Sequence, residues 1–369
     1  MTHFNSYVSN TIAGASNQFI FSTNQDTSRA FYKITRGGKY TYSLVFTNTI
    51  DSTFADGAQC QKNVICSQWE ILGARVCTVR AQELNDSILQ SEEALASLNN
   101  LLNGFVPLTF GGKSTKQVAP AEIFSSDEIE LDIASGDYLC LELTYKGEKM
   151  PYHEEAIIPI CKKTSTSWHL HKKMPLPAMV GIKRETRAKI GFIGDSITQG
   201  IGVPLNHYTH WNAIVARELG DDYAYWNLGI GFGRANDIAS LGAWFNKALQ
   251  NDVLVVCYGV NDIMQGFSEN QVKNDLKTTV MALKKAGKRV ILQTVPPFDY
   301  NEEKKAIWEH VNDFIKTELA REVDLVFDVV PYLGKSEEEP QIAKFGGHPN
   351  EDGCAIWGLA LSKALKDIL

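Results

Sequence analysis

From Arg187 to the C-terminus, short apolar runs alternate with longer amphipathic stretches, and this alternation constrains the fold more than any other feature. The apolar runs have the length of buried strands and lie at 190–193, 223–228, 253–258, 290–295 and 325–329. Apolar residues at helical spacing follow them at 208–219, 235–249, 269–286, 301–318 and 351–369. Strand–helix repeats of this length build a parallel sheet with helices on both faces. We therefore expect a three-layer α/β/α domain over residues 188–369.

The first half of the chain has a different pattern. Between about residues 16 and 160, short runs rich in aromatic and β-branched residues are separated by turns such as Gly37-Gly38 and Gly111-Gly112. One helical patch interrupts them at 86–102. Many short strands with glycine turns predict a β-sandwich of jelly-roll type over residues 1–161.

Residues 162–187 differ from both halves because they are polar, basic and marked by prolines. This composition predicts a linker or a strap between two domains. His169 and His171 lie in this stretch without a companion cluster of Cys, Asp or Glu, so we expect a surface or interface role for them and no metal.

Length and charge exclude several classes of protein. At 369 residues the chain exceeds the usual size of a single core, which predicts two domains. A net charge of -7 argues against a general nucleic-acid binder, and no apolar run has the length that crosses a bilayer. The N-terminal residues show no basic stretch followed by an apolar one. We expect a cytoplasmic protein without nucleic-acid or membrane partners, and the sequence leaves its oligomeric state open.

The seven cysteines are odd in number and irregular in spacing, and no pair has the C-x-x-C spacing of zinc or redox sites. We expect buried thiols in a reducing compartment, and neither a metal nor a cofactor. A pair between Cys60 and Cys66 is the alternative for an exported protein.

The first strand of the α/β half ends abruptly in Gly194-Asp195-Ser196. Gly194 lets the chain turn sharply because it has no Cβ, so Ser196 can be held at the lip of the sheet. Open α/β sheets place their chemistry at the carboxyl ends of their strands. An ordinary strand-to-helix turn is the alternative, since Gly, Asp and Ser are all common in turns.

A serine is a weak nucleophile until a base takes its proton. His348 stands directly before the last helix, in a loop from which it can point into a cleft. Acyl transfer also needs donors aimed at the developing oxyanion. The glycine-rich loop 227–233 follows the second strand, and Asn261 follows the third, so these groups converge on one edge of the sheet.

With these four blocks, the chain from about Lys189 onward resembles the SGNH hydrolases, also called the GDSL esterase/lipase family. Gly194-Asp195-Ser196 matches the nucleophile block, Gly259-Val-Asn261-Asp262 the third, and Gly347-His348-Pro349-Asn350 the fourth. The glycine of the second block falls at Gly231 when the following helix sets the register, and at Gly233 when the count starts from Asn227. The β-rich first half resembles the accessory domain of some carbohydrate esterases.

One position departs from the family pattern. Members usually carry an Asp three residues before the histidine, and Phe345 stands there in this chain. That Asp orients the imidazole and stabilises its charged form. A backbone carbonyl near Phe345 can take its place and give a Ser-His dyad, which we favour. Another carboxylate can substitute, the nearest in sequence being Asp328, Glu339 and Asp352, or the site can be inactive.

The resemblance implies a serine esterase with Ser196 as nucleophile and His348 as base. The oxyanion hole then consists of the Ser196 and Gly231 N–H groups and the Asn261 amide, while Asp195 and Asp262 brace the loops. We expect a small acyl substrate, foremost an acetylated sugar or oligosaccharide, because the accessory β-rich half and the aromatic residues near the site loops suit stacking on sugar rings: Tyr208, Trp211, Phe232, Tyr258 and Phe267. The same aromatics fall at the spacing of core residues, so a structural use is the alternative for Trp211 and Tyr258. The alternatives are a lipase or thioesterase of the same family and an inactive carbohydrate-binding protein. A Rossmann-type nucleotide domain fits poorly because Gly-Asp-Ser replaces the G-x-G-x-x-G loop.

Overall fold

The structure is a computed structural model that describes residues 3–55, 59–153, 157–333, 343–345 and 347–369. The chain forms two compact units. Unit 1 comprises Met1–Ile50 and Val64–Glu185, and unit 2 comprises Thr186–Leu369 together with the separate segment Asp51–Asn63. In the part that the structure describes, no helix is both long and apolar enough to cross a membrane.

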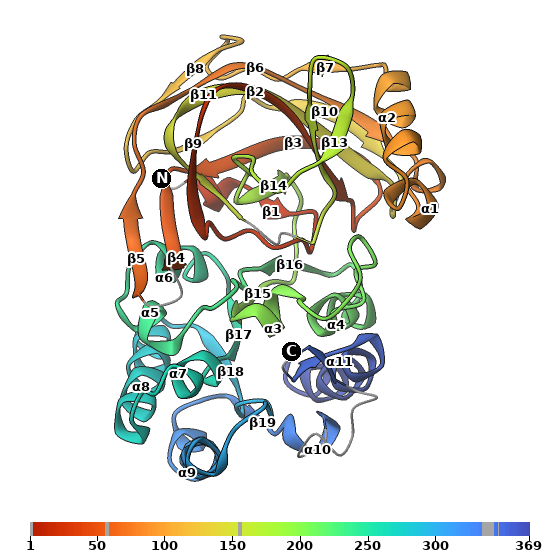
Figure 1. The fold of residues 1–369 in the computed structure, drawn as a ribbon. Helices are drawn as coiled ribbons and strands as arrows, with labels where there is room; N and C mark the ends of the chain where they lie inside the picture. Colours follow the sequence, from red (N-terminus) through yellow and green to blue (C-terminus); the bar gives the residue numbers. More distant parts are fainter. Residues whose placement is uncertain (1–2, 56–58, 154–156, 334–342, 346) are drawn as a thin grey trace. The chain divides into compact units, whose positions relative to one another are not determined.

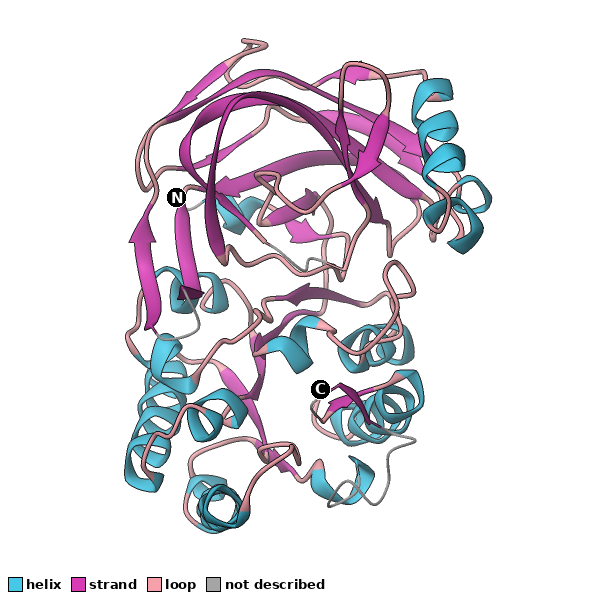
Figure 2. Cartoon of the chain, in the orientation of Figure 1, coloured by secondary structure: helices cyan, strands magenta, loops and turns pink. Residues whose placement is uncertain are grey.

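Unit 1 is built from antiparallel sheets, as the β-rich pattern predicts (Figure 2). One sheet has the order β1-β14-β3-β10, with β9 also paired to β3; the strands are β1 (Val8–Ser9), β3 (Gly38–Thr47), β9 (Ile123–Ser125), β10 (Ile129–Ile133) and β14 (Met179–Ile182). The other has the order β13-β12-β2-β11-β6-β7, with β8 also paired to β6; the strands are β2 (Phe19–Lys33), β6 (Trp69–Val79), β7 (Val106–Pro107), β8 (Lys116–Val118), β11 (Tyr138–Tyr152), β12 (Ile160–Lys163) and β13 (Trp168–Leu170). Its helical elements are η1 (His3–Ser6), η2 (Ala81–Glu83), α1 (Asp86–Leu89) and α2 (Glu92–Leu101). The jelly-roll connectivity stays a prediction.

The stretch 162–187, expected to be a linker or a strap, contributes strands to both sheets of unit 1. Trp168, Met174 and Leu176 in this stretch are buried, and all four residues of β14 are buried as well. These apolar side chains are spread singly among lysines and prolines, so local composition hides them. Packing against the sheets therefore decides the structure of this segment.

Unit 2 contains the parallel sheet that the strand–helix alternation predicts, and its strand order is β16-β15-β17-β18-β19. The strands are β15 (Ala188–Gly194), β16 (Tyr223–Asn227), β17 (Val253–Cys257), β18 (Arg289–Gln293) and β19 (Leu325–Phe327). Every residue of the central strand β17 is buried, which explains its continuous apolar sequence. The expected α/β class is thereby confirmed.

Helices cover both faces of this sheet, with α4 and α11 on one side and α5, α7 and α8 on the other (Figure 1). The helical elements of unit 2 are α3 (Ser196–Gln199), α4 (Trp211–Leu219), α5 (Ala235–Ala239), α6 (Ala243–Ala248), α7 (Val260–Met264), α8 (Glu269–Lys285), α9 (Glu302–Thr317), η3 (Leu319–Arg321), α10 (Val330–Leu333) and α11 (Glu351–Lys366). Two short strand pairs complete the described elements: β4 (Thr49–Ala55) with β5 (Gln59–Ile65), and β20 (Ala343–Phe345) with β21 (His348–Pro349).

Candidate active site

Ser196 is the first residue of α3, and Asp195 alone separates it from the end of β15. Asp195 caps this short helix, because its Oδ1 accepts the Ile197 N–H at 2.9 Å. A Cβ at position 194 would collide with the Thr198 side chain and the Cys257 carbonyl, so only glycine fits where β15 meets the helix. The sequence therefore turns sharply at this point and holds a partly exposed serine at the end of the strand.

The geometry brings His348 to this serine, since the Ser196 Oγ and the His348 Nε2 lie 2.8 Å apart. His348 belongs to β21 and is only 7% exposed. The Phe298 ring packs edge-on against the imidazole, with 5.4 Å between ring centroids. Gly202, at φ +105°, lies so close to the Pro349 carbonyl that a side chain would clash. The Phe298 ring thus packs against the imidazole, while Gly202 leaves room for the main chain that carries it.

The Nδ1 side of His348 has several candidate partners. The Phe345 main chain pairs with His348 in the β20–β21 register. The Asp328 Oδ1 accepts hydrogen bonds from Thr294 Oγ1 and the Val330 N–H, and Asp352 is exposed in the first turn of α11. Glu339 lies outside the described residues. The main chain near Phe345 is thus placed beside the histidine, whereas the Asp328 oxygen is engaged elsewhere.

The loop after β16 approaches the nucleophile loop through its main chain. The Ile230 N–H donates to the Gly194 carbonyl at 3.1 Å, which brings Gly231 close to the Asp195-Ser196 turn. The Gly233 N–H donates to the Ile230 carbonyl at 3.0 Å, so it is used inside the loop. The loop that contains both glycines is therefore held against the end of β15, and the choice of Gly231 as the oxyanion donor stays a prediction.

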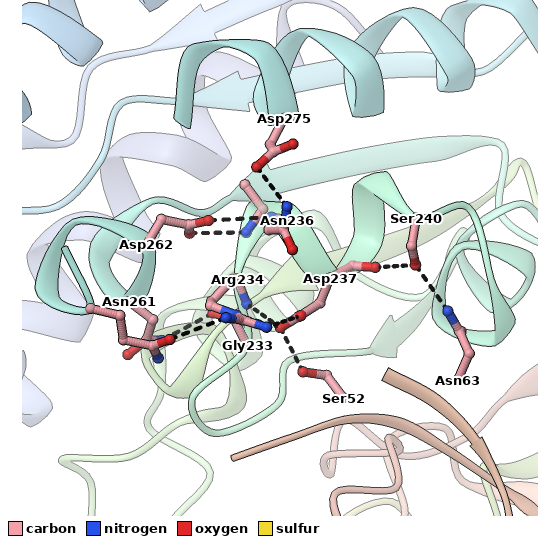
Figure 3. A network of polar contacts seen from close by, with 12 residues as sticks. Ser52, Asn63, Gly233, Arg234, Asn236, Asp237, Ser240, Asn261, Asp262 and Asp275 are labelled. Atoms are coloured by element: carbon pink, nitrogen blue, oxygen red, sulfur yellow. Dashed lines mark hydrogen bonds and ion pairs between the residues drawn. The ribbon is translucent and has the colours of Figure 1, made fainter. Parts of the chain in front are cut away.

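The third loop joins the second through Asn261, which lies in the first turn of α7. One N–H of the Asn261 side chain donates to the Gly233 carbonyl at 3.0 Å (Figure 3). A side-chain amide has two N–H donors, so the same group can hold this loop and still offer a hydrogen to a ligand. Gly259 allows the approach, because its φ of +122° is a conformation that side chains disfavour.

Asp262 and Asp195 are buried carboxylates beside these loops. The Asp262 oxygens accept the N–H groups of Ala235 and Asn236, the first residues of α5, at 3.0 and 3.2 Å (Figure 3). Burial raises the pKa of Asp262 to about 7. Burial also raises the pKa of Asp195 to about 7, and the charge of Asp262 adds to that rise. Asp262 thus fixes the start of the helix that follows the glycine loop, and Asp195 fixes the start of the helix that carries Ser196.

Two of the five aromatic residues expected near the site are core residues. Trp211 is fully buried and stacks on Trp357 with ring centroids 4.6 Å apart, and Tyr258 packs edge-on against Trp244. Neither ring can stack on a sugar. Phe232 is different, because it is 45% exposed directly after Gly231.

Sequence reasoning missed a buried polar cluster that supports the glycine loop. The Arg234 guanidinium forms an ion pair with Asp237, with Nη2 and Oδ1 2.6 Å apart, and Ser52 donates to the same carboxylate (Figure 3). The sequence does indicate this ion pair, because an Arg directly after the glycine loop is followed three residues later by an Asp. The participation of Ser52 has no signal in the sequence, since it lies 185 residues away.

The cysteines and the side chains that could bind a metal are also expected to lack a metal or redox role. The cysteines whose side chains the structure describes are buried: Cys66, Cys77, Cys140, Cys161, Cys257 and Cys354. The side chain of Cys60 lies outside the described residues, so its pairing with Cys66 stays a prediction. Among the described residues, no group of three or more His, Cys, Asp or Glu side chains is placed to hold a metal ion.

A family match covers the stretch that contains the four blocks. Residues 192–356 match the family described as GDSL-like Lipase/Acylhydrolase. A search of curated proteins found no match. The chain is similar to a solved member of the lipolytic protein G-D-S-L family from Veillonella parvula, with 24% identity, 49% of this chain and 97% of that chain covered, and a TM-score of 0.42. It is also similar to Est24, a carbohydrate acetylesterase from Sinorhizobium meliloti, with 15% identity, 50% and 100% covered, and a TM-score of 0.38.

Proposed function

We propose that the protein is a serine esterase of the GDSL-like lipase/acylhydrolase family, whose model matches residues 192–356. It hydrolyses small acyl esters, foremost acetyl esters, on carbohydrate. The observation that carries the proposal is the 2.8 Å distance between Ser196 Oγ and His348 Nε2 at the carboxyl end of β15. A general base must lie within hydrogen-bond reach of the proton that it abstracts, and this pair meets that condition.

In the first half-reaction, the Ser196 oxygen attacks the ester carbonyl carbon while its proton passes to His348 Nε2. The carbonyl oxygen becomes an oxyanion beside the Ser196 and Gly231 N–H groups and the Asn261 amide. The intermediate collapses, the ester C–O bond breaks, and His348 gives its proton to the leaving alcohol. Water then attacks the acyl-serine with the same histidine as base, which releases the acid and restores the serine.

For Nε2 to accept the serine proton, the imidazole must carry its own proton on Nδ1. The backbone pairing of Phe345 with His348 supports a dyad in which a main-chain carbonyl receives that proton. In this arrangement Asp328→Asn and Asp352→Asn keep kcat within about fivefold of the wild type. Removal of an acid that orients the histidine would instead lower kcat by about 10⁴.

The carbohydrate part of the proposal rests on Phe232. Its ring is exposed one residue after the oxyanion glycine, in a left-handed conformation at φ +60° that a bulky residue adopts only where the surroundings impose it. An exposed ring at this position offers a face on which a sugar can stack. Buried thiols suit a reducing compartment, and we keep the cytoplasm as the proposed location.

The decisive experiment combines a variant, a label and a substrate panel. Ser196→Ala loses at least about 10⁴-fold in kcat on p-nitrophenyl acetate, because no other group forms the acyl-enzyme. A fluorophosphonate phosphonylates Ser196 Oγ in the wild type: the O–P bond forms, the P–F bond breaks with release of fluoride, and the serine proton passes to His348. Mass spectrometry locates the adduct. Acetylated sugars should give a higher kcat/KM than p-nitrophenyl esters of longer acyl chains. Full activity in Ser196→Ala, or a wild type without an adduct, would contradict the proposal.

A further inference from the structure

Unit 2 contains a piece of chain that comes from far upstream. The segment Asp51–Asn63, which spans most of β4 and β5, groups with residues 186–369 although the intervening chain belongs to unit 1. Its described side chains are those of Asp51, Ser52 and Asn63, and each of them contacts α5 or α6 or the turn between these helices. These two helices follow directly after the glycine loop that contains Gly231.

The first contact reaches the glycine loop in two steps. Ser52 is buried, and its Oγ donates to Asp237 Oδ2 at 2.7 Å (Figure 3). The same Oδ2 accepts from the Arg234 N–H and from Arg234 Nε, both at 3.1 Å. Arg234 follows Gly233, whose carbonyl accepts from Asn261. One chain of hydrogen bonds thus joins Ser52 to the loop that supplies the oxyanion N–H.

The second contact is a buried ion pair. Lys247 Nζ lies 2.5 Å from Asp51 Oδ2, and both side chains are almost completely buried. A buried charge without its partner is costly, so this pair fixes the segment against α6 far more firmly than a surface pair could.

The third contact shows that the helices are shaped to receive the segment. Asn63 occupies the space in which a side chain at Gly242 would lie. Its Oδ1 accepts the Ala243 N–H at 2.7 Å, at the first turn of α6, and its Nδ2 donates to Ser240 Oγ at 2.9 Å. Asn63 itself has a left-handed backbone, at φ +55°. The upstream segment therefore matches the turn between α5 and α6 both in shape and in hydrogen bonds.

From these contacts we infer that Asp51–Asn63 is a working part of the esterase and that Ser52 is a positioning residue for the oxyanion loop. The inference rests on the proposed function. Ser52 does not touch the substrate. It holds the Asp237 carboxylate, Asp237 holds Arg234, and Arg234 sets the path of the loop that presents the Gly231 N–H. Small displacements of such a donor are expensive in rate, because the transition state is stabilised only at short distances.

The test measures kinetics in Ser52→Ala, Ser52→Thr and the control Ser362→Ala, each in the full-length protein. Ser362 is a matched control because it is also buried, and its hydroxyl donates to Leu359 within α11, away from the glycine loop. With p-nitrophenyl acetate, kcat falls about tenfold in Ser52→Ala and KM stays within about twofold. Ser52→Thr keeps the hydroxyl and recovers most of kcat, and Ser362→Ala keeps wild-type kcat.

A second readout separates positioning from loss of stability. Phenylboronic acid forms a tetrahedral adduct with Ser196 that needs the oxyanion donors. The inhibition constant should therefore rise in Ser52→Ala by the same factor by which kcat/KM falls. The urea midpoints of Ser52→Ala and Ser362→Ala should be alike, since each loses one hydroxyl group.

If the wild type is active but Ser52→Ala leaves both kcat/KM and boronate inhibition unchanged, the positioning role of Ser52 is overturned. The proposed esterase function would still stand. A wild type that neither hydrolyses esters nor reacts with the fluorophosphonate would instead contradict the proposed function. The two failures are therefore distinguishable.

Discussion

The two units bury charged side chains in different ways. In unit 1, Arg29 and Glu142 on neighbouring strands form an ion pair with Nη2 and Oε2 2.7 Å apart, and the Arg29 guanidinium lies over the Trp168 ring at 4.1 Å. In unit 2, Asp195 and Asp262 are buried at the strand ends and accept main-chain N–H groups. The paired charges of unit 1 join two strands, and Arg29 also donates to the Asn99 carbonyl in α2. Asp195 and Asp262 shape the loops around Ser196 instead. Buried charge therefore serves packing in unit 1 and at the Asp51–Lys247 pair of unit 2, whereas beside Ser196 the buried carboxylates serve loop geometry.

Loss of the amide at the site should have the largest effect. Asn261→Ala removes the proposed oxyanion donor and also the hydrogen bond to the Gly233 carbonyl. We expect kcat to fall about 10²- to 10³-fold, with a small change in KM, because the donor acts chiefly in the transition state. Steady-state kinetics on p-nitrophenyl acetate measure this effect. A drop in kcat of less than about threefold would remove Asn261 from the oxyanion hole.

In unit 1, loss of a buried charge should lower the stability of the fold and leave kcat unchanged. Glu142→Gln leaves the buried Arg29 without its charge partner and weakens the contact with Arg75, so the free energy of unfolding should fall by about 3 kcal/mol. Equilibrium urea unfolding measures this loss, and kcat of the folded protein should stay the same. The control is Glu130→Gln, which breaks an exposed pair with Lys39 and should leave the midpoint in place. A fall in kcat with unchanged stability would invalidate the contrast between the units.

The smallest effect concerns pH. Burial raises the pKa of Asp195 and of Asp262 to about 7, so the folded protein holds protons that the unfolded chain has already released. Each of these groups makes stability fall as pH rises between about 4 and 7, with a slope of at most about 1.4 kcal/mol per pH unit. Asp195→Asn should reduce the slope of the free energy of unfolding against pH, and Asp262 accounts for the slope that is left. Urea unfolding at several pH values checks this, and equal slopes in the wild type and the variant would contradict it.

The sequence predicts most of the catalytic sheet, because buried parallel strands are continuous apolar runs. All five expected strands lie within two residues of β15–β19. It also predicts which four loops meet, since the carboxyl ends of parallel strands share one edge. The chemical signal at Ser196 and His348 is local, and the distance between them follows from the topology.

The remainder depends on contacts that no local pattern contains. The apolar periodicity over 235–249 predicts one helix, yet the structure has α5 and α6, separated near Leu241 at φ +57°. The break coincides with the place where Asn63 fills the space beside Gly242 and bonds to the Ala243 N–H. A residue almost two hundred positions upstream thus helps to decide where a helix starts. The strands within the lysine-rich stretch 162–187 cannot be predicted for a similar reason, because its buried side chains are too sparse to form a pattern.

The upstream origin of Asp51 and Ser52 has a consequence for biosynthesis. Both residues leave the ribosome well before Asp237 and Lys247 exist, and the delay is roughly 10 to 40 s at a synthesis rate of about 5–20 residues per second. During that interval the Asp51 carboxylate, which is buried in the folded protein, remains exposed to water. We expect the hydrolase unit to mature only after translation of its last helices, and no single cut of the gene separates it from the domain made first.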